Sequence, residues 1–200
     1  MMKIYDLDLS GNCYKVRLFA ALANLELEII PVDFLQGEHQ AEPLLSLNPL
    51  GELPIFIDDK LVLRDSQAIL IYLAGKYAGE AWWPSTASLQ AEVAQWLFTA
   101  ANEVQHGLCA ARLVDKFAYA LDKSRALTQA YKTLKILEVH LNDREWLAIN
   151  RPTIADIAIF PYVALAAEGG IDLSPYKNIN RWLERIKKLD RFLYMPGIEK

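Results

Sequence analysis

The sequence predicts two domains, an α/β domain with the element order βαβ and then ββα, followed by an all-helical domain. Residues 1–77 alternate short strand-like and helix-like segments, whereas only helical periodicity remains from about residue 88 onward. The charge changes at the same place, because residues 1–77 carry six basic and eleven acidic side chains while residues 78–200 carry fifteen and fourteen. We therefore expect a first domain at 1–78, a linker at 79–87 and a second domain at 88–200.

The first domain is expected to hold four strands and two helices. The pattern predicts a strand at residues 3–6, a helix at 12–24, strands at 27–32, 53–57 and 60–63, and a helix at 65–77. A strand, a helix and a second strand in succession favour parallel pairing of the two strands. Asp58 and Asp59 form a two-residue turn between the last two strands, which favours a hairpin.

The second domain is expected to consist of long helices at residues 88–117, 124–141, 153–168 and 178–189. The third of these begins with Thr153 and Asp156, which have the spacing of a capping box. In that motif the Thr153 hydroxyl accepts a hydrogen bond from the amide of the third helical residue, and Asp156 accepts one from the Thr153 amide. We expect this pair to be structural.

Composition excludes several classes of protein. The formal net charge is −4 and no basic block interrupts the chain, so we expect no nucleic-acid partner. No stretch approaches the roughly 18 apolar residues of a membrane span, and early acidic residues argue against a secretory signal, so we expect no membrane association and a cytoplasmic location. Cys13 and Cys109 are too few and too far apart for a disulfide framework or a zinc site, so we expect no metal.

Two positions of the first domain favour recognition of a peptide-like ligand. Pro54 stands at the start of a strand, where a cis Leu53–Pro54 bond turns the main-chain N–H and C=O of Leu53 outward; a trans bond that merely ends strand pairing is the alternative. Asp65 and Ser66 open the next helix. An acidic side chain there can bind an ammonium group, and the amides at the start of the helix favour a carboxylate, so the pair suits the zwitterionic end of an amino acid. The alternative is an ordinary N-cap, which uses the same residue types.

A third position lies between the first strand and the first helix, where βαβ folds display reactive groups. The sequence from Ser10 to Cys13 has the spacing of Cys-x-x-Cys with serine in place of the leading cysteine. A dithiol cycle within this motif is therefore excluded.

Five segments in this order resemble the soluble glutathione S-transferases. They are Ser10-Gly-Asn-Cys-Tyr-Lys-Val-Arg17, Gly37-Glu-His-Gln40, Asn48-Pro-Leu-Gly-Glu-Leu-Pro54, Asp65-Ser-Gln-Ala-Ile69 and Arg151-Pro-Thr-Ile-Ala-Asp156. The resemblance covers essentially the whole chain and is closest to the serine-type bacterial and theta/phi-like members. It implies a thioredoxin-like first domain, an all-helical second domain, glutathione as co-substrate and a homodimer.

The resemblance implies a set of glutathione-binding residues: His39, Gln40, Glu52, Leu53, Pro54, Asp65 and Ser66. Leu53, before Pro54, would pair through its main chain with the cysteinyl part of glutathione. Asp65 would face the ammonium and Ser66 the carboxylate of the γ-glutamyl end. His39, expected in an exposed loop, would meet the glycyl carboxylate, and Gln40 stands where many phi-like relatives have lysine.

The same resemblance gives three candidate catalytic residues, of which Ser10 is the first choice. Ser10 matches the serine whose hydroxyl donates to the glutathione sulfur. Asn12 would donate an amide N–H to that sulfur, as in bacterial members that reduce glutathione-linked disulfides. Cys13 would form a mixed disulfide with glutathione, but this position of the motif usually points inward, where a thiol is inert.

The electrophile is expected between the domains, in a pocket near Leu9, Asn102, Gln105, His106, Cys109 and Arg112. Tyr119 and Trp182 are aromatic walls of this pocket or ordinary core residues. The leading hypothesis is an enzyme of detoxification that conjugates glutathione to a small hydrophobic electrophile. The alternatives are a glutathione-dependent peroxidase or disulfide reductase on the same site, and a non-catalytic interaction protein with the same fold.

Overall fold

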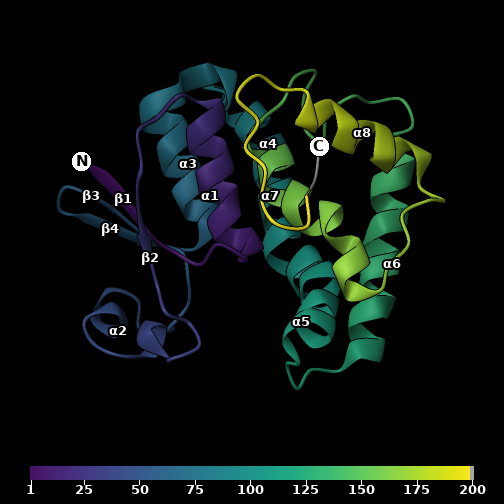
Figure 1. Cartoon of the computed structure of the whole chain (residues 1–200). Coiled ribbons are helices and arrows are strands. Elements are labelled where there is room, and N and C mark those ends of the chain that lie inside the picture. Colours follow the sequence, from purple (N-terminus) through teal and green to yellow (C-terminus); the bar gives the residue numbers. More distant parts are fainter. Residues whose placement is uncertain (199–200) are drawn as a thin grey trace.

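The computed structural model describes residues 1–198 of the chain (Figure 1). The first half contains β1 (Met2–Asp6), α1 (Gly11–Leu22), β2 (Glu28–Pro31), α2 (Leu44–Leu47), β3 (Ile55–Asp58), β4 (Leu61–Arg64) and α3 (Ser66–Leu73). The second half contains α4 (Ala87–Thr99), α5 (Ala110–Phe117), α6 (Lys123–His140), α7 (Ile154–Ala164) and α8 (Lys177–Lys187). The predicted fold class is confirmed, while the domain limits near residues 78 and 88 stay a prediction.

The four strands form one mixed sheet in the order β2-β1-β3-β4. β1 pairs with β2 in parallel, as the βαβ order predicts, and with β3 antiparallel. β3 and β4 form the predicted hairpin, in which Asp58 lies opposite Leu61. Asp59 in the turn has a φ of 52°, a left-handed conformation that aspartate tolerates better than most residues.

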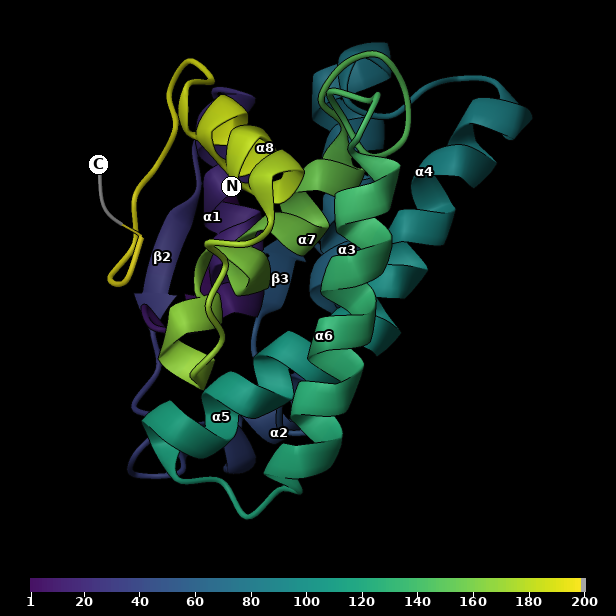
Figure 2. The ribbon, with the colours of Figure 1, turned by 90° about the vertical axis from the view of Figure 1, so that its right-hand side faces the viewer.

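Helix α7 lies at the centre of the molecule. Every residue from Ile154 to Val163 is buried, and the helix contacts α1 and α3 of the first half as well as α4 and α8 of the second. Figure 2 shows α7 among these helices, with α6 and α4 alongside. The Ser10–Cys13 motif stands at the start of α1, so the contact between α1 and α7 places this motif beside the helical domain.

The capping box at the start of α7 is confirmed. Asp156 Oδ2 accepts from the Thr153 amide at 2.9 Å, and Thr153 Oγ1 accepts from the amide of Ala155 at 3.2 Å, the second rather than the third helical residue. Asp156 Oδ1 also accepts from the Leu147 amide at 3.0 Å and from Trp182 Nε1 at 2.9 Å. Burial raises the pKa of Asp156, and the donated hydrogen bonds oppose that shift. Trp182 is therefore a core residue.

Several element boundaries differ from the predictions. The helix expected at 88–117 is continuous, but residues Ala100–Cys109 between α4 and α5 are π-helical. Gly107 lies in this stretch, and a Cβ there would come within 2.8 Å of the Ala130 amide nitrogen on α6. The four-residue helix α2 was not predicted. β3 begins at Ile55, two residues later than expected, because Pro54 has no N–H to donate to a neighbouring strand.

The segment after α8 returns to the first half of the chain, where Figure 1 shows it in yellow beside α1. Tyr14 of α1 donates its hydroxyl to the Leu193 carbonyl, and Arg191 Nη1 donates to Asn24 Oδ1 at 2.5 Å. Phe192 packs edge-on against Phe160 of α7, with 5.5 Å between ring centroids. These contacts join the two halves.

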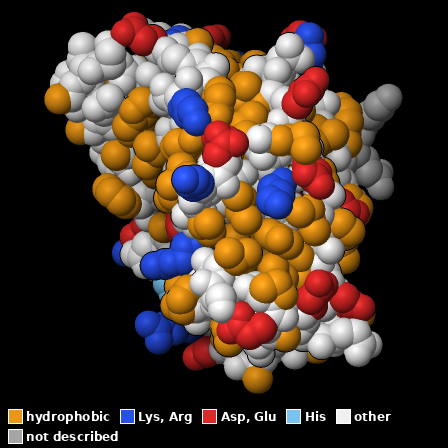
Figure 3. Space-filling model, turned by 90° about the vertical axis from the view of Figure 1, so that its left-hand side faces the viewer, with side chains coloured by type: hydrophobic (Ala, Val, Ile, Leu, Met, Phe, Trp, Pro, Cys, Tyr) orange, Lys and Arg blue, Asp and Glu red, His pale blue; other side chains and the backbone are white. Residues whose placement is uncertain are grey.

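The surface is mixed in character. Figure 3 shows the side on which the sheet lies, where hydrophobic side chains are exposed between acidic and basic ones. Within residues 1–198, no helix has both the length and the apolar character needed to cross a bilayer.

Candidate functional site

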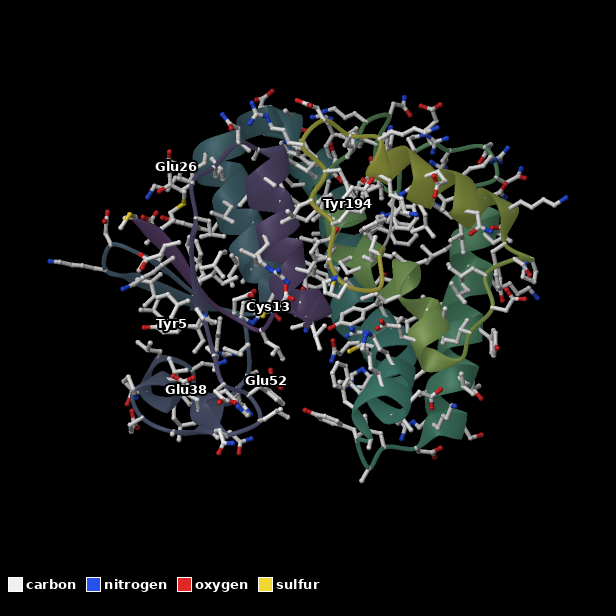
Figure 4. All side chains as sticks on the ribbon, viewed as in Figure 1. Tyr5, Cys13, Glu26, Glu38, Glu52 and Tyr194 are labelled. Carbon is white, nitrogen blue, oxygen red and sulfur yellow. The ribbon has the colours of Figure 1, made fainter. Side chains whose placement is uncertain are left out.

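A small pocket of about 100 Å³ lies where the start of α1, the loop before β3 and the start of α3 meet. It is lined by Asn12, Asn48, Leu50, Glu52, Leu53, Pro54, Arg64, Asp65 and Ser66. Six of these nine residues were predicted as site residues, although they come from three separate segments of the sequence. In Figure 4, Cys13 marks the start of α1 between the two halves of the molecule, and Glu52 lies below it.

The loop before β3 supplies main-chain groups to this pocket. The Leu53–Pro54 bond is cis, as predicted. Asn48, which is buried, holds the loop: its Nδ2 donates to the Glu52 carbonyl at 2.7 Å, and its Oδ1 accepts from the Leu50 amide at 3.1 Å. The loop is thus fixed from within by one side chain, so its outward-facing main chain is held ready for a ligand.

Asp65 and Ser66 form the opposite wall. Asp65 is the N-cap of α3, and its Oδ1 accepts from the amides of Gln67 at 2.8 Å and Ala68 at 3.1 Å. The N-cap interpretation is therefore correct as far as it goes, but the φ of Asp65 is +69°, a strained conformation for a residue other than glycine. Strain of this kind, on an exposed carboxylate beside a pocket, is typical of a ligand-binding residue.

Ser10 begins α1 as its N-cap. Its Oγ accepts from the Cys13 amide at 3.3 Å, so the hydroxyl hydrogen is left for a further acceptor. Ser10 is half-buried and does not line the 100 Å³ pocket, whereas Asn12 does. The three catalytic candidates thus start one helix, but only Asn12 faces the residues predicted to hold glutathione.

Cys13 is fully buried, with its Sγ 3.5 Å from the Leu7 amide, which donates to it. Burial, together with the nearby carboxylate of Asp6, raises the pKa of the Cys13 thiol to about 12. The thiol is therefore protonated at neutral pH and out of reach of solvent, which argues against a nucleophilic role.

His39 and Gln40 lie apart from the pocket. His39 was expected in an exposed loop, and this is wrong: its ring is buried and stacks on Phe34 with 3.9 Å between centroids. Within the described chain its Nδ1 is buried with no hydrogen-bond partner. Gln40 is exposed and packs beside Gly51, whose φ of +60° shapes the loop before β3.

The six residues predicted around the electrophile are not brought into one pocket. Asn102 and His106 line a larger pocket of about 590 Å³ between the π-helical stretch and α6, together with Glu103, Asp122, Ser124, Arg125, Thr128, Gln129 and Lys132. Leu9 and Gln105 are half-buried elsewhere. Cys109 and Arg112 are buried, and Arg112 Nε donates to Glu168 at 2.6 Å, so neither walls an open cleft.

Sequence reasoning missed four residues of the site. Asn48, Leu50 and Arg64 line the pocket, and Asn48 had a signal, since an asparagine before Pro-x-Gly often fixes a turn by its side chain. Lys15 lies fully buried behind Asn12, to which its Nζ donates at 2.9 Å. Its signal was a charge on the apolar face of the first helix.

Among residues 1–198, no group of three or more His, Cys, Asp or Glu side chains is placed to hold a metal ion.

Comparison with known proteins agrees with this geometry. The family model described as "Glutathione S-transferase, N-terminal domain" matches residues 1–75, and the one described as "Glutathione S-transferase, C-terminal domain" matches residues 110–190. The chain is 30% identical over 184 residues to glutathione S-transferase 2 of Anopheles gambiae, covering 91% of this chain and 88% of that protein. It is 31% identical over 199 residues to glutathione S-transferase 3 of Zea mays, covering 92% and 88%.

Solved structures lead to the same family. The glutathione S-transferase of Pseudomonas fluorescens superposes with a TM-score of 0.89 at 33% identity, covering 97% of this chain and 98% of that one. Glutathione transferase E6 of Drosophila melanogaster superposes with a TM-score of 0.86 at 27% identity, covering 95% and 88%. With both family domains matched in order and relatives similar over nine-tenths of its length, the chain belongs to the glutathione S-transferase family.

Proposed function

We propose that this protein is a glutathione transferase that ionises the glutathione thiol and conjugates it to a small hydrophobic electrophile. The observation that carries the proposal is the pocket at the start of α1, which Leu53 and the cis Pro54 line together with Asp65 and Ser66 at the start of α3. This set matches the three parts of glutathione that a binding site must distinguish: an ammonium group, an α-carboxylate and an extended peptide main chain.

The γ-glutamyl end is assigned to α3. The exposed carboxylate of Asp65 pairs with the ammonium group, and Ser66, the first residue of α3, binds the α-carboxylate at the positive end of the helix dipole. The main chain of Leu53 pairs with the cysteinyl residue. Glu52 borders the same pocket, and His39 and Gln40 are assigned to the glycyl end on the resemblance alone, because both lie apart from the pocket and the His39 ring is buried.

The sulfur is assigned to Ser10. A thiol has a reference pKa near 8.5, and lowering it by about two units requires roughly 2.7 kcal/mol of preferential stabilisation of the thiolate. A hydrogen bond to a charged acceptor contributes about 1.5 to 3 kcal/mol, and the start of a helix about 0.3 to 1 kcal/mol. A hydrogen bond from the free hydroxyl hydrogen of Ser10, together with the start of α1, therefore contributes enough free energy to make the thiolate the main species at neutral pH.

The electrophile is assigned to Leu9 of the first domain and to the π-helical stretch of the second, although these residues do not line one pocket. Leu9, Asn102, Gln105 and His106 are all at least partly exposed and present both polar and apolar groups. Cys109 and Arg112 are buried, so they are assigned no contact with the electrophile. Specificity for the electrophile then resides in the second domain, while glutathione is bound by the first.

A second activity has one observation in its favour. Asn12, rather than Ser10, lines the pocket beside Leu53 and Ser66. In the resemblance described above, an asparagine at this place belongs to members that reduce glutathione-linked disulfides. A glutathione-dependent disulfide reductase or peroxidase on the same site is therefore the alternative.

We further propose a homodimer, because apolar side chains are exposed on α4 and α6. Phe98 is 72% exposed and Val139 69%, and Ile136 lines a groove of about 250 Å³ between these helices. An exposed apolar area of this kind is typical of an interface between subunits. The cytoplasmic location stays a prediction from the sequence.

A pair of measurements tests the proposed function. Glutathione should raise the melting temperature of the protein by stabilising the folded state, and the conjugation rate with an aryl halide should exceed the reduction rate with a glutathione-linked disulfide. A faster reduction by orders of magnitude would favour the alternative activity. No rise in melting temperature with glutathione, S-hexylglutathione or glutathione disulfide would contradict both enzymatic proposals.

A further inference from the structure

Lys15 is a charged side chain in a place where charge is costly. It lies on α1, is fully buried, and packs between α3 and α7. Its Nζ donates to Asn12 Oδ1 at 2.9 Å and to Gln67 Oε1 at 3.3 Å, and lies 5.3 Å from the ring centroid of Tyr162. A buried ammonium group without partners is strongly destabilising, so these two carbonyl oxygens are what makes its burial tolerable.

The ammonium group fixes the orientation of both carboxamides. An ammonium has three donors and no acceptor, so Asn12 and Gln67 must turn their oxygens, not their NH₂ groups, toward Lys15. The Ser66 hydroxyl faces the same two oxygens, and its one hydrogen is donated to Gln67 Oε1, with Asn12 Oδ1 at 3.4 Å as the alternative acceptor. A reversed carboxamide would place donor against donor inside the protein, which is unfavourable.

The NH₂ group of Asn12 is therefore left for the pocket. Across residues 1–198, no hydrogen bond uses Asn12 Nδ2, and Asn12 lines the pocket together with Ser66. Ser66 Oγ lies 3.4 Å from Asn12 Oδ1, and both residues line the pocket, so the NH₂ group of the same carboxamide is the donor assigned to an anion at Ser66. Under the proposed function, the anion at Ser66 is the γ-glutamyl carboxylate.

The surroundings keep Lys15 mostly charged. Burial lowers the pKa of Lys15 to about 8, and the carboxylate of Asp65 at the start of α3 opposes that shift. A pKa above 7 leaves the ammonium as the main form at neutral pH. The orientation of Asn12 is thus fixed under ordinary conditions.

We propose that Lys15 is a positioning residue for glutathione, which locks the Asn12 carboxamide so that its NH₂ group binds the γ-glutamyl carboxylate beside Ser66. This inference rests on the proposed function, since it assigns a further donor to the same site. It also explains why the fold holds a buried lysine at this place, where an apolar side chain would avoid the cost of burying a charge.

The test compares glutathione with γ-aminobutyryl-cysteinyl-glycine, which lacks only the α-carboxylate of the glutamyl residue. Dissociation constants for both ligands are measured by calorimetry in the wild-type protein, Lys15→Met, Asn12→Ala and the double variant. The wild-type protein should prefer glutathione, and Lys15→Met should lose about tenfold of that preference. In the Asn12→Ala background, Lys15→Met should add little, because Lys15 acts through Asn12.

Lys76→Met is the matched control, because Lys76 pairs with the buried Asp58 in the same domain, away from the pocket. It should lower stability and leave the preference for glutathione unchanged. Equal weakening of both ligands by Lys15→Met would show a general structural role and overturn the inference. So would a Lys15→Met effect that persists undiminished in the Asn12→Ala background, since Lys15 would then act by its charge alone.

A second measurement uses no Lys15 variant, so it tests the inference even if Lys15→Met does not fold. In the wild-type protein, the side-chain NH₂ resonances of Asn12, assigned by their absence in Asn12→Ala, should shift with glutathione and not with the decarboxylated analogue. Equal shifts with the two ligands would overturn the inference. Absence of glutathione binding by the wild-type protein would instead contradict the proposed function itself, so the two failures are distinguishable.

Discussion

Gly11 and Tyr162 are in direct contact across the two halves of the molecule. A Cβ atom added at Gly11 would lie 2.8 Å from both Cε1 and Cζ of the Tyr162 ring, and that ring is buried. Tyr162 belongs to the central helix α7 and Gly11 to the first turn of α1, one residue after Ser10. The absence of a side chain at Gly11 therefore sets how closely the start of α1 approaches the helical domain.

Gly11→Ala should therefore be destabilising. The Tyr162 ring is buried and would have to displace its neighbours to make room, and overpacking of this kind typically costs about 1 to 3 kcal/mol. The free energy of unfolding, measured with urea, should fall by that amount, and the conjugation rate should fall because the start of α1 moves. Gly75→Ala is the control, since a Cβ there has only Trp83 at 4.0 Å. Equal stability of the two variants would contradict the contact.

The second prediction concerns Asp156, which accepts four hydrogen bonds in the core. Asp156→Ala leaves the Thr153 amide, the Leu147 amide and Trp182 Nε1 without an acceptor, and should lower the free energy of unfolding by at least about 3 kcal/mol. Asp156→Asn should cost less, because one amide oxygen remains to accept. Urea unfolding checks this order, and a loss below about 1 kcal/mol in Asp156→Ala would refute the role of the network.

Asp65→Asn separates ligand binding from helix capping. Asparagine has the shape of aspartate and keeps an oxygen for the amides of α3, but it has no charge for the glutathione ammonium group. The dissociation constant for glutathione should rise at least tenfold, about 1.4 kcal/mol, with little loss of stability. Asp59→Asn, at another left-handed aspartate with a φ of 52°, is the matched control. An unchanged constant in Asp65→Asn would mean that the ammonium is held elsewhere.

Phe98→Asp tests the proposed dimer. Phe98 is the largest exposed apolar side chain on α4, and a carboxylate at this position would have to be buried without a partner in the interface. Sedimentation at micromolar concentration should show a dimer for the wild-type protein and a monomer for the variant. A wild-type monomer would contradict the prediction.

Local sequence patterns predicted much of the fold. The two units of the first domain and the Thr153–Asp156 capping box depend on residues close together in the sequence, so periodicity and spacing predict them well. The four-residue helix α2 contains barely one turn, so it has no period to detect. The π-helical stretch at Ala100–Cys109 was not predictable either, because its hydrophobic pattern still reads as an ordinary helix.

The site residues whose place depends on main-chain geometry were predictable from the sequence, whereas those whose place depends on side-chain packing were not. Pro54 and the Asp65–Ser66 pair are recognisable from their position before a strand and a helix, and they line the pocket. His39 was expected to be exposed, but stacking on Phe34 buries it. Lys15 was recognisable only as a charge on the apolar face of the first helix, and its partners were not predictable, since Gln67 is 52 residues away.

Ser10 is the residue assigned to ionise glutathione. Titration of the thiolate absorbance of bound glutathione measures this directly in the wild-type protein and in Ser10→Ala, Asn12→Ala and Cys13→Ala. The wild-type complex should titrate below the reference thiol pKa of about 8.5, Ser10→Ala should raise that pKa by about one to two units, and Cys13→Ala should leave it in place. A pKa that does not move in Ser10→Ala, or that moves further in Asn12→Ala, would contradict the account.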